Sequence, residues 1–295
     1  MKGTTGFNNA FWVTDKSASI RFSPDKDSTQ SPLKNFKLKN AYSLNSMGQE
    51  KLNKFYALEE KDFFDFLQKI RGNMNDSLVQ IAFEKAKVRN KKIIEFVSTN
   101  GDLYYSFWLF RNRIITDMDA NPDSLIKTYN TIFSDSLKKS FEGNEIIKYL
   151  NGRRLSINNN YIDFIANDIT GKIFSLSKCQ SKYVLLTFWA SWCGPCIKEL
   201  TYIKELRKLY SNDELEIVSV SWDNQLLDLT KAIKRYQINW IHIFDNNEIT
   251  NSYGIVAIPE VFLIDILSKK IIYRNHENDY DMVNIHKILT ESLKR

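Results

Sequence analysis

The chain contains 295 residues, about twice the usual length of a single domain, so we expect two domains. Hydrophobic residues make up 43% and charged residues 26% of the sequence, a balance typical of globular proteins. Ten glycines and five prolines are too few for a disordered, collagen-like or turn-dense all-β chain. No apolar run approaches the length that a membrane-spanning helix needs. These features predict a soluble, folded protein rich in helices.

The net charge of +6 does not by itself indicate a nucleic-acid partner. The densest basic cluster lies within a predicted helix, and the expected role of such a cluster is a solvated helix face. It comprises Lys85, Lys87, Arg89, Lys91 and Lys92. The first thirty residues contain no basic segment followed by an apolar one, which taken literally indicates a cytosolic protein. A mature or trimmed chain would look the same, so the sequence leaves the compartment open.

The N-terminal half is predicted to combine short strands with helices. Apolar stretches at 10–13 and 20–22 predict a strand pair, and residues 36–41 predict one more short strand. From about residue 46 to 150, apolar side chains recur with the i, i+3, i+4 spacing of amphipathic helices. The expected helices cover 46–70, 76–97 with Asp76 as its cap, 102–115, a segment opened by Asn121-Pro122, and 142–150. The aromatic residues of the third helix are expected to pack in a core.

After residue 152 the pattern changes to alternating strands and helices. The expected strands are 161–166, 171–176, 183–190, 215–221, 240–244, 260–266 and 270–273, and the expected helices are 195–210, 224–237 and 279–294. This alternation predicts a mixed sheet covered on both faces by helices. We therefore expect a short β segment at 1–45, a helical domain at 46–152 and an α/β domain at 153–295.

Two of the three cysteines form the C-x-x-C pair Cys193-Gly194-Pro195-Cys196. An apolar strand precedes the pair and an amphipathic helix follows it. Cys193 is therefore expected at an exposed helix N-terminus, where free N–H groups favour its thiolate. Pro195 fits the first helical turn, because its missing N–H costs nothing there. Cys196, turned inward on the helix, can resolve a mixed disulfide on Cys193, which predicts thiol–disulfide exchange.

Other roles for these cysteines are less well supported. A structural zinc site needs about four ligands, but the sequence has no second C-x-x-C and its histidines lack ligand-like spacing, so we expect no metal. A purely structural disulfide would not need the strand–turn–helix setting. The third cysteine, Cys179, is expected to be an incidental, half-buried thiol.

The segment Trp189-Ala190-Ser191-Trp192-Cys193-Gly194-Pro195-Cys196 resembles the active site of the TlpA/ResA-like thiol-disulfide oxidoreductases, which have a thioredoxin fold. Ile258-Pro259, followed by an apolar strand, resembles the cis-proline loop of that family. The resemblance covers about residues 155–295. The helical region before it is similar, more weakly, to the corresponding part of Bacteroidota members, in which a small β domain precedes the helices. Residues 1–45 then correspond to the remnant of a trimmed β domain.

The resemblance implies an α/β fold, with a thioredoxin-like mixed central sheet flanked by helices and preceded by a mostly α-helical domain with a short β segment. It implies catalysis by Cys193 and Cys196 without a cofactor other than their own disulfide. It also implies protein thiols and disulfides as partners, a membrane or envelope electron donor, and a location in the periplasm or cell envelope. Trp192, Gly194, Pro195, Ile258 and Pro259 would then form the wall that binds the substrate, whereas Trp189 is expected in the core.

Three positions bear on proton transfer. Cytosolic thioredoxins carry a buried Asp six residues before the first cysteine, and Thr187, which cannot take up a proton, stands there in this chain. The TlpA/ResA-like proteins instead have a Glu three residues after the second cysteine, which is Glu199 here. Glu199 shares a helix face with Cys196, and we expect it to accept the Cys196 proton, the alternative being a first-turn Glu that complements the helix dipole. Glu260, in a place where Thr or Ser is common, is expected to point to solvent.

The leading hypothesis is a thiol-disulfide oxidoreductase that reduces protein disulfides, because Gly194-Pro195 is the dipeptide of reducing thioredoxins. One alternative is a peroxiredoxin-like peroxide reductase, which Ala190 disfavours because that family has Thr or Ser three residues before its reactive cysteine. The other alternative is a partner-binding protein with an auxiliary thioredoxin-like domain.

Overall fold

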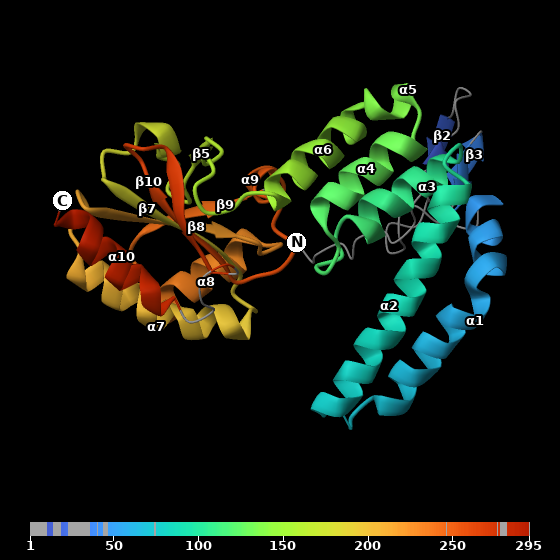
Figure 1. The fold of residues 1–295 in the computed structure, drawn as a ribbon, viewed down its shortest axis with the longest axis horizontal. Coiled ribbons are helices and arrows are strands. Elements are labelled where there is room, and N and C mark those ends of the chain that lie inside the picture. The colour runs from blue at the N-terminus through green and yellow to red at the C-terminus, as the bar shows by residue number, and fades with distance from the viewer. Residues whose placement is uncertain are drawn as a thin grey trace. The chain divides into compact units, whose positions relative to one another are not determined.

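The computed structural model describes residues 11–13, 19–22, 36–39, 41–43, 47–73, 75–245, 247–275, 277 and 282–294. Within this part of the chain there are two compact units. The first contains residues up to 114 together with 132–134, and the second contains residues 115–131 and those from 135 onward. Figure 1 labels the elements of both units.

The first unit combines four short strands with helices. Its elements are β1 (Phe11–Val13), β2 (Ser19–Phe22), β3 (Phe36–Lys39), β4 (Ala41–Ser43), α1 (Met47–Ile70), α2 (Asp76–Thr99), α3 (Tyr104–Leu109) and the π-helical turn η1 (Phe110–Ile114). The aromatic residues of α3 and η1 pack as expected, since Phe107 and Phe110 are buried and both meet the ring of Phe133 edge-on. Tyr104 is an exception, with 45% of its surface exposed.

Two expectations for this unit are wrong in detail. Strands β1 and β2 do not pair with each other; β1 pairs with β4 and β2 with β3, both antiparallel. Alternating apolar residues identify a strand and its faces but not its neighbour, which explains the error. Helix α2 is capped by Asn75, whose side chain accepts a hydrogen bond from the Leu78 N–H at 3.0 Å, so Asp76 is the first helical residue instead.

The basic cluster of α2 is occupied by local partners. Lys85 pairs with Asp62 of α1 at 2.5 Å, and Arg89 stacks over the Phe63 ring at 4.4 Å from its centre. Lys92 pairs with Glu95 at 3.1 Å. The contacts of Lys85 and Arg89 join α1 to α2, whereas the Lys92 pair lies within α2, and all three fit the solvated helix face that the sequence predicts.

The second unit contains a five-stranded mixed sheet with helices on its faces. Its elements are α4 (Pro122–Ile132), α5 (Asp135–Lys138), α6 (Phe141–Arg153), β5 (Ile165–Asn167), β6 (Ile173–Ser175), the 3₁₀ turn η2 (Leu176–Lys178), β7 (Tyr183–Trp189), α7 (Gly194–Leu209), β8 (Leu215–Ser221), α8 (Leu226–Tyr236), β9 (Ile241–Phe244), α9 (Glu248–Ser252), β10 (Glu260–Asp265), β11 (Lys270–Arg274) and α10 (Val283–Leu293). The strand order is β11-β10-β7-β8-β9, with β7, β8 and β9 parallel and β10 antiparallel to both of its neighbours. This is a thioredoxin-like sheet (Figure 1).

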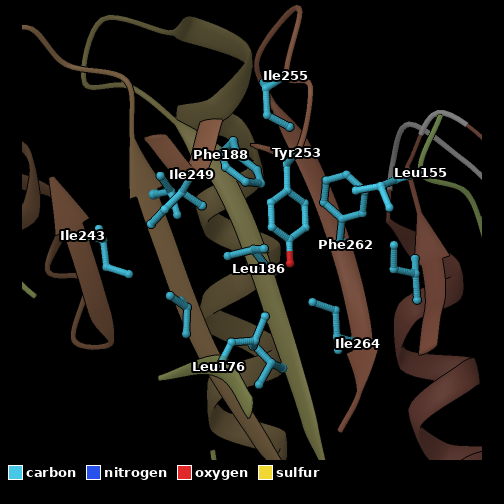
Figure 2. Close-up of a cluster of buried hydrophobic side chains, with 14 residues drawn as sticks. Leu155, Leu176, Leu186, Phe188, Ile243, Ile249, Tyr253, Ile255, Phe262 and Ile264 are labelled. Atoms are coloured by element: carbon cyan, nitrogen blue, oxygen red, sulfur yellow. The ribbon is translucent and has the colours of Figure 1, made fainter. Parts of the chain in front are cut away.

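Each face of this sheet carries its own core. On one face the Tyr253 ring lies between Phe188 of β7 and Phe262 of β10 (Figure 2), with ring centres 5.5 and 5.3 Å away. On the other face, Leu185 and Leu263 of the sheet pack with residues of α7 and α10. Strand β7 is buried along its whole length because both of its faces are covered, which accounts for its unbroken apolar sequence.

Helix α6 approaches α9 closely enough that only glycine fits at the contact. A Cβ atom on Gly152 would lie 2.5 Å from the Gly254 nitrogen, and a Cβ on Gly254 would lie 2.7 Å from the Tyr149 carbonyl oxygen. Gly254 also has a φ of +61°, which favours glycine. The Tyr149 hydroxyl donates to the Ile255 carbonyl oxygen at 3.4 Å. The domain boundary expected at residue 152 falls inside this second unit, and as the limit of an independently folding domain it stays a prediction.

The remaining elements follow the expected order with shifted ends. The strand expected at 161–166 is limited to Ile165–Asn167, and α9 is an element that the sequence pattern did not indicate. Residues 279–281, the expected start of the last helix, lie outside the described residues. No helix in the described ranges combines the length and hydropathy needed to cross a bilayer.

Candidate functional site

The cysteine pair lies where β7 leads into α7. Cys193 is the N-cap of α7, and its Sγ accepts a hydrogen bond from the Cys196 N–H at 3.2 Å. A disulfide joins the two cysteines. Gly194 and Pro195, in the first turn, are exposed. Cys196 is 1% exposed, and Cys193 only 5%, so the expectation that Cys193 is exposed does not hold for this disulfide form. Both cysteines of the disulfide are therefore buried.

Two tryptophans flank the pair in opposite environments. Trp189, at the end of β7, is 3% exposed and lies in the core, whereas Trp192 is 63% exposed beside Cys193. A large apolar side chain that remains in water next to a disulfide offers a flat contact surface for a partner. Trp192 also borders a groove of about 460 Å³, whose other lining residues are Trp222, Asp223, Asn224, Phe244, Asp245 and Asn247.

The loop between β7 and Cys193 is held by a buried carboxylate that sequence reasoning missed. Asp223 accepts hydrogen bonds from the Ser191 N–H at 3.1 Å and from the Ser191 hydroxyl at 2.6 Å. The Ser221 hydroxyl donates to its second oxygen at 2.8 Å. Because Ser191 lies two residues before Cys193, these bonds fix the approach to the helix. Asp223 follows an apolar strand in the sequence, but nothing local to it indicates Ser191 as its partner.

Glu199 extends from the second turn of α7, on the helix face that carries Cys196. No acidic residue lies in the first turn of this helix, so the alternative of a first-turn dipole partner does not describe Glu199. Its side chain is half-buried. Burial, and in second place the nearby charge of Glu260, raises the pKa of Glu199 to about 7. A carboxyl group with this pKa can take up and release a proton near neutral pH.

Glu260 does not point to solvent, contrary to expectation. It is 3% exposed, and the Arg274 Nε donates to its Oε1 at 2.6 Å. The Arg274 side chain is itself 13% exposed, so this is a largely buried ion pair. The register places Glu260 opposite Phe188 of β7, inside the sheet, where an unpaired charge would be costly. The pairing partner explains why a carboxylate is tolerated there.

The loop before β10 lies against the cysteine pair. The Ile258–Pro259 peptide bond is cis. The Ile258 carbonyl oxygen lies 3.8 Å from the Cys193 Sγ, which in the disulfide carries no hydrogen, so this is a packing contact and not a hydrogen bond. Both residues of the loop are half-buried. Of the predicted site residues, the fold thus brings Trp192, Cys193, Cys196, Glu199, Ile258 and Pro259 to one end of the sheet.

The buried hydroxyl of Thr187 belongs to a small cluster of uncharged polar side chains. The Thr187 hydroxyl donates to the Ser219 Oγ at 3.2 Å, and the Trp240 Nε1 donates to the same oxygen at 2.6 Å. His242 packs between Trp189 and Trp240, and burial lowers its pKa to about 4. Neither ring nitrogen of His242 has a hydrogen-bond partner among the described residues. His242 is therefore neutral at physiological pH.

The other candidate ligands and thiols are dispersed. Cys179 is a free, half-buried thiol that packs against the core shown in Figure 2. Across the described part of the chain, no three His, Cys, Asp or Glu side chains come together as a metal site would require.

The sequence of the second compact unit is similar to those of known proteins. Residues 162–289 match the Redoxin family model. The thiol-disulfide oxidoreductase ResA of Geobacillus thermodenitrificans (strain NG80-2) is 33% identical over 104 residues, which cover 35% of this chain and 60% of that protein. ResA of Bacillus subtilis (strain 168) is 31% identical over 104 residues, which cover 35% of this chain and 58% of that protein. The matched region thus spans about 60% of the length of these relatives.

Solved structures are also similar to part of this chain. The thioredoxin domain of a thiol-disulfide oxidoreductase from Bacteroides vulgatus is 26% identical, with a TM-score of 0.41, and the match covers 46% of this chain and 99% of that domain. StoA from Bacillus subtilis is 25% identical, with a TM-score of 0.35, and the match covers 38% of this chain and 86% of StoA. The sequence matches and the sheet order with its C-x-x-C pair agree with one another. The thioredoxin-like part of this chain is similar to the Redoxin family model and to the ResA thiol-disulfide oxidoreductases.

Proposed function

We propose that this protein is a thiol-disulfide oxidoreductase that reduces protein disulfides through Cys193 and Cys196. The observation that carries the proposal is the cysteine pair at the N-terminus of α7, with the half-buried carboxyl of Glu199 on the same helix. The names of the ResA relatives support the same class of activity. Because the match spans only part of those relatives, the substrates of the whole protein are part of the proposal.

The reaction starts from the reduced pair. The Cys193 thiolate, stabilised by the free N–H groups of α7, attacks one sulfur of the substrate disulfide and forms a mixed disulfide, while the other substrate sulfur leaves as a thiolate. Cys196 then gives its proton to the Glu199 carboxylate and attacks the Cys193 sulfur. The second substrate thiolate leaves, and two electrons have passed from the protein to the substrate. A dithiol donor must then reduce the Cys193–Cys196 disulfide.

The loop at Ile258 and Pro259 is proposed to bind the substrate backbone. The N–H and C=O groups of Ile258 have no hydrogen-bonded backbone partner among the described residues, so an extended polypeptide can pair with them next to Cys193. Trp192 would contact the side chains of the same polypeptide. Such a partner is a protein disulfide, and neither a nucleic acid nor a small-molecule cofactor is part of the proposal.

We also propose that the protein works in the periplasm or cell envelope and receives electrons from a membrane or envelope donor. This part of the proposal is supported only by the resemblance to the TlpA/ResA-like family. It is tested by locating the protein in fractionated cells of its source, and by trapping the donor as a mixed disulfide with a Cys196→Ser variant.

Insulin reduction by the purified protein tests the central claim. We expect turnover that is lost in Cys193→Ser, whereas persistent turnover in that variant would refute the assignment. The redox potential should lie on the order of −230 to −280 mV, as in reducing thioredoxins. A value near about −120 mV, which is typical of an oxidant, would refute the reductase assignment. A peroxide-turnover assay discriminates the peroxiredoxin alternative, and a protein without either activity would favour the partner-binding alternative.

A further inference from the structure

The loop that contacts Cys193 is fixed by hydrogen bonds to one buried side chain, that of Asn275. Asn275 directly follows β11 and is 1% exposed. Its Oδ1 accepts a hydrogen bond from the Val261 N–H at 3.2 Å, and its Nδ2 donates to the Pro259 carbonyl oxygen at 3.3 Å. One amide therefore satisfies the backbone groups on both sides of Glu260, and the chemistry of those groups fixes the orientation of the amide.

This arrangement replaces a ladder hydrogen bond of the sheet. The Asn275 N–H donates to the Val261 carbonyl oxygen at 3.2 Å, as expected for the next pair of β10 and β11. The Val261 N–H, however, bonds to the Asn275 side chain. The side chain thereby also reaches the Pro259 carbonyl, which the main chain of β11 does not engage. The strand interaction is extended by two residues toward Cys193.

Arg274, the last residue of β11, holds Glu260, which lies between Pro259 and Val261. Arg274 binds the Glu260 carboxylate and also donates to the Leu155 carbonyl oxygen. Pro259, Glu260 and Val261 are thus each tied to Arg274 or Asn275, and Ile258 comes immediately before them. The Ile258 carbonyl is the group that lies against the Cys193 sulfur.

We infer that Asn275 is a positioning residue that holds the Pro259–Val261 segment so that Ile258 presents its backbone to a polypeptide disulfide beside Cys193. The inference rests on the proposed function and deepens it. The substrate class that it assigns to the protein is an extended polypeptide, because a polypeptide can pair with the backbone of Ile258. A small disulfide reaches the Cys193 sulfur without using that backbone.

The test compares two substrates in two variants. Asn275→Asp keeps the shape of the side chain but sets a carboxylate oxygen against the Pro259 carbonyl, and Asn275→Ala removes both hydrogen bonds. We expect kcat/KM for insulin to fall about tenfold or more in both variants, mainly through KM, because misplacing a binding group is costly. The rate with a small aromatic disulfide should stay within about twofold, since reaction at Cys193 itself is unaltered.

A matched control separates positioning from general damage. Asn100 is also buried, and its Nδ2 donates to the Phe96 carbonyl oxygen at 2.8 Å, but it lies in the first compact unit. Asn100→Asp should leave the ratio of the two rates unchanged. Melting temperatures of all variants show whether the protein is folded at the assay temperature.

The outcomes are distinct. Selective loss toward insulin supports the inference. Equal loss toward both substrates, or no loss toward either, overturns it and leaves Asn275 with a structural role only. If the wild-type protein reduces neither substrate, or Cys193→Ser retains the activity, the proposed function itself has failed, and this result does not depend on Asn275.

Discussion

Replacing Glu199 with Gln tests whether this carboxyl group holds a proton that the catalytic cycle uses. Its pKa is about 7 in the folded protein, against an ordinary value of 4.5. The difference is equivalent to about 3 kcal/mol of folding free energy, an upper limit because the half-buried side chain keeps some contact with water. The main cause is burial, so the charged form is the costly one.

The sign of the effect on stability follows from the proton count. Between pH 4.5 and pH 7 the folded protein keeps a proton on Glu199 that the unfolded chain has released. The free energy of unfolding of the disulfide form should therefore decrease as the pH rises through this window, and the contribution is fully lost above pH 7. Glu199→Gln cannot titrate, so at pH 8 it should be more stable than the wild type by up to about 3 kcal/mol. Below pH 4.5 the two proteins should be nearly equal. Urea denaturation across pH 4 to 8 measures the difference.

Glu199→Gln should slow catalysis even though it stabilises the protein at pH 8. Without a proton acceptor for Cys196, Glu199→Gln should slow disulfide exchange by about tenfold or more, while the alkylation rate of Cys193 changes less. The wild-type exchange rate should also rise with pH near 7, as Glu199 loses its proton, and the variant should lack this inflection. Stopped-flow exchange rates over the same pH range measure both effects.

Glu205 offers a matched control on the same helix. It pairs with Lys208 at 2.8 Å, and its side chain is 56% exposed. Glu205→Gln should change the stability by no more than about 0.5 kcal/mol and leave the exchange rate unaltered. If Glu199→Gln behaves like this control in both assays, Glu199 is not a proton acceptor and our reasoning is wrong.

Three further results are expected. In the reduced protein, iodoacetamide should modify Cys193 before Cys196, and mass mapping with the opposite order would reverse their roles. Gly254→Ala should lower the free energy of unfolding by about 3 kcal/mol, because the added Cβ meets backbone atoms. Gly171 has a φ of +86° and open space around it, so Gly171→Ala should cost only about 1 kcal/mol of backbone strain. Urea titration measures both values. His242→Phe should make the protein less sensitive to acid. Between pH 6.5 and about 4 the imidazole of the unfolded wild type takes up a proton and the buried imidazole does not, so the wild type loses stability as the pH falls through this range. A variant with the wild-type acid dependence would show that His242 is not responsible.

Local sequence patterns were sufficient where neighbouring residues determine the structure. The apolar run of β7 and the glycine and proline that follow it predict a buried strand leading into a helix, and the structure has this arrangement. The two cysteines are three residues apart, so their proximity also follows from local geometry.

Prediction failed where a side chain is controlled by a distant partner. Glu260 looks like a surface carboxylate until Arg274, fourteen residues away, is placed beside it by the pairing of β10 and β11. Asp223 is equally uninformative alone, since its partner Ser191 precedes it by thirty-two residues. Hydrogen-bond partners of this kind depend on strand register, which the spacing of apolar residues does not specify between non-adjacent segments.

The contact between α6 and α9 bears on how this protein should be divided for expression. The family match begins at residue 162, but Gly152 and Tyr149 lie against the backbone of Gly254 and Ile255, inside the second compact unit. A fragment that starts at residue 153 would leave that backbone facing water, without the helix that covers it. Arg153, whose guanidinium binds the Ile115 and Ala120 carbonyl oxygens, connects the same helix to the segment before α4. A fragment that starts near residue 115 would retain both contacts. We therefore expect this fragment, and not the one that starts at residue 153, to be purified as a folded protein.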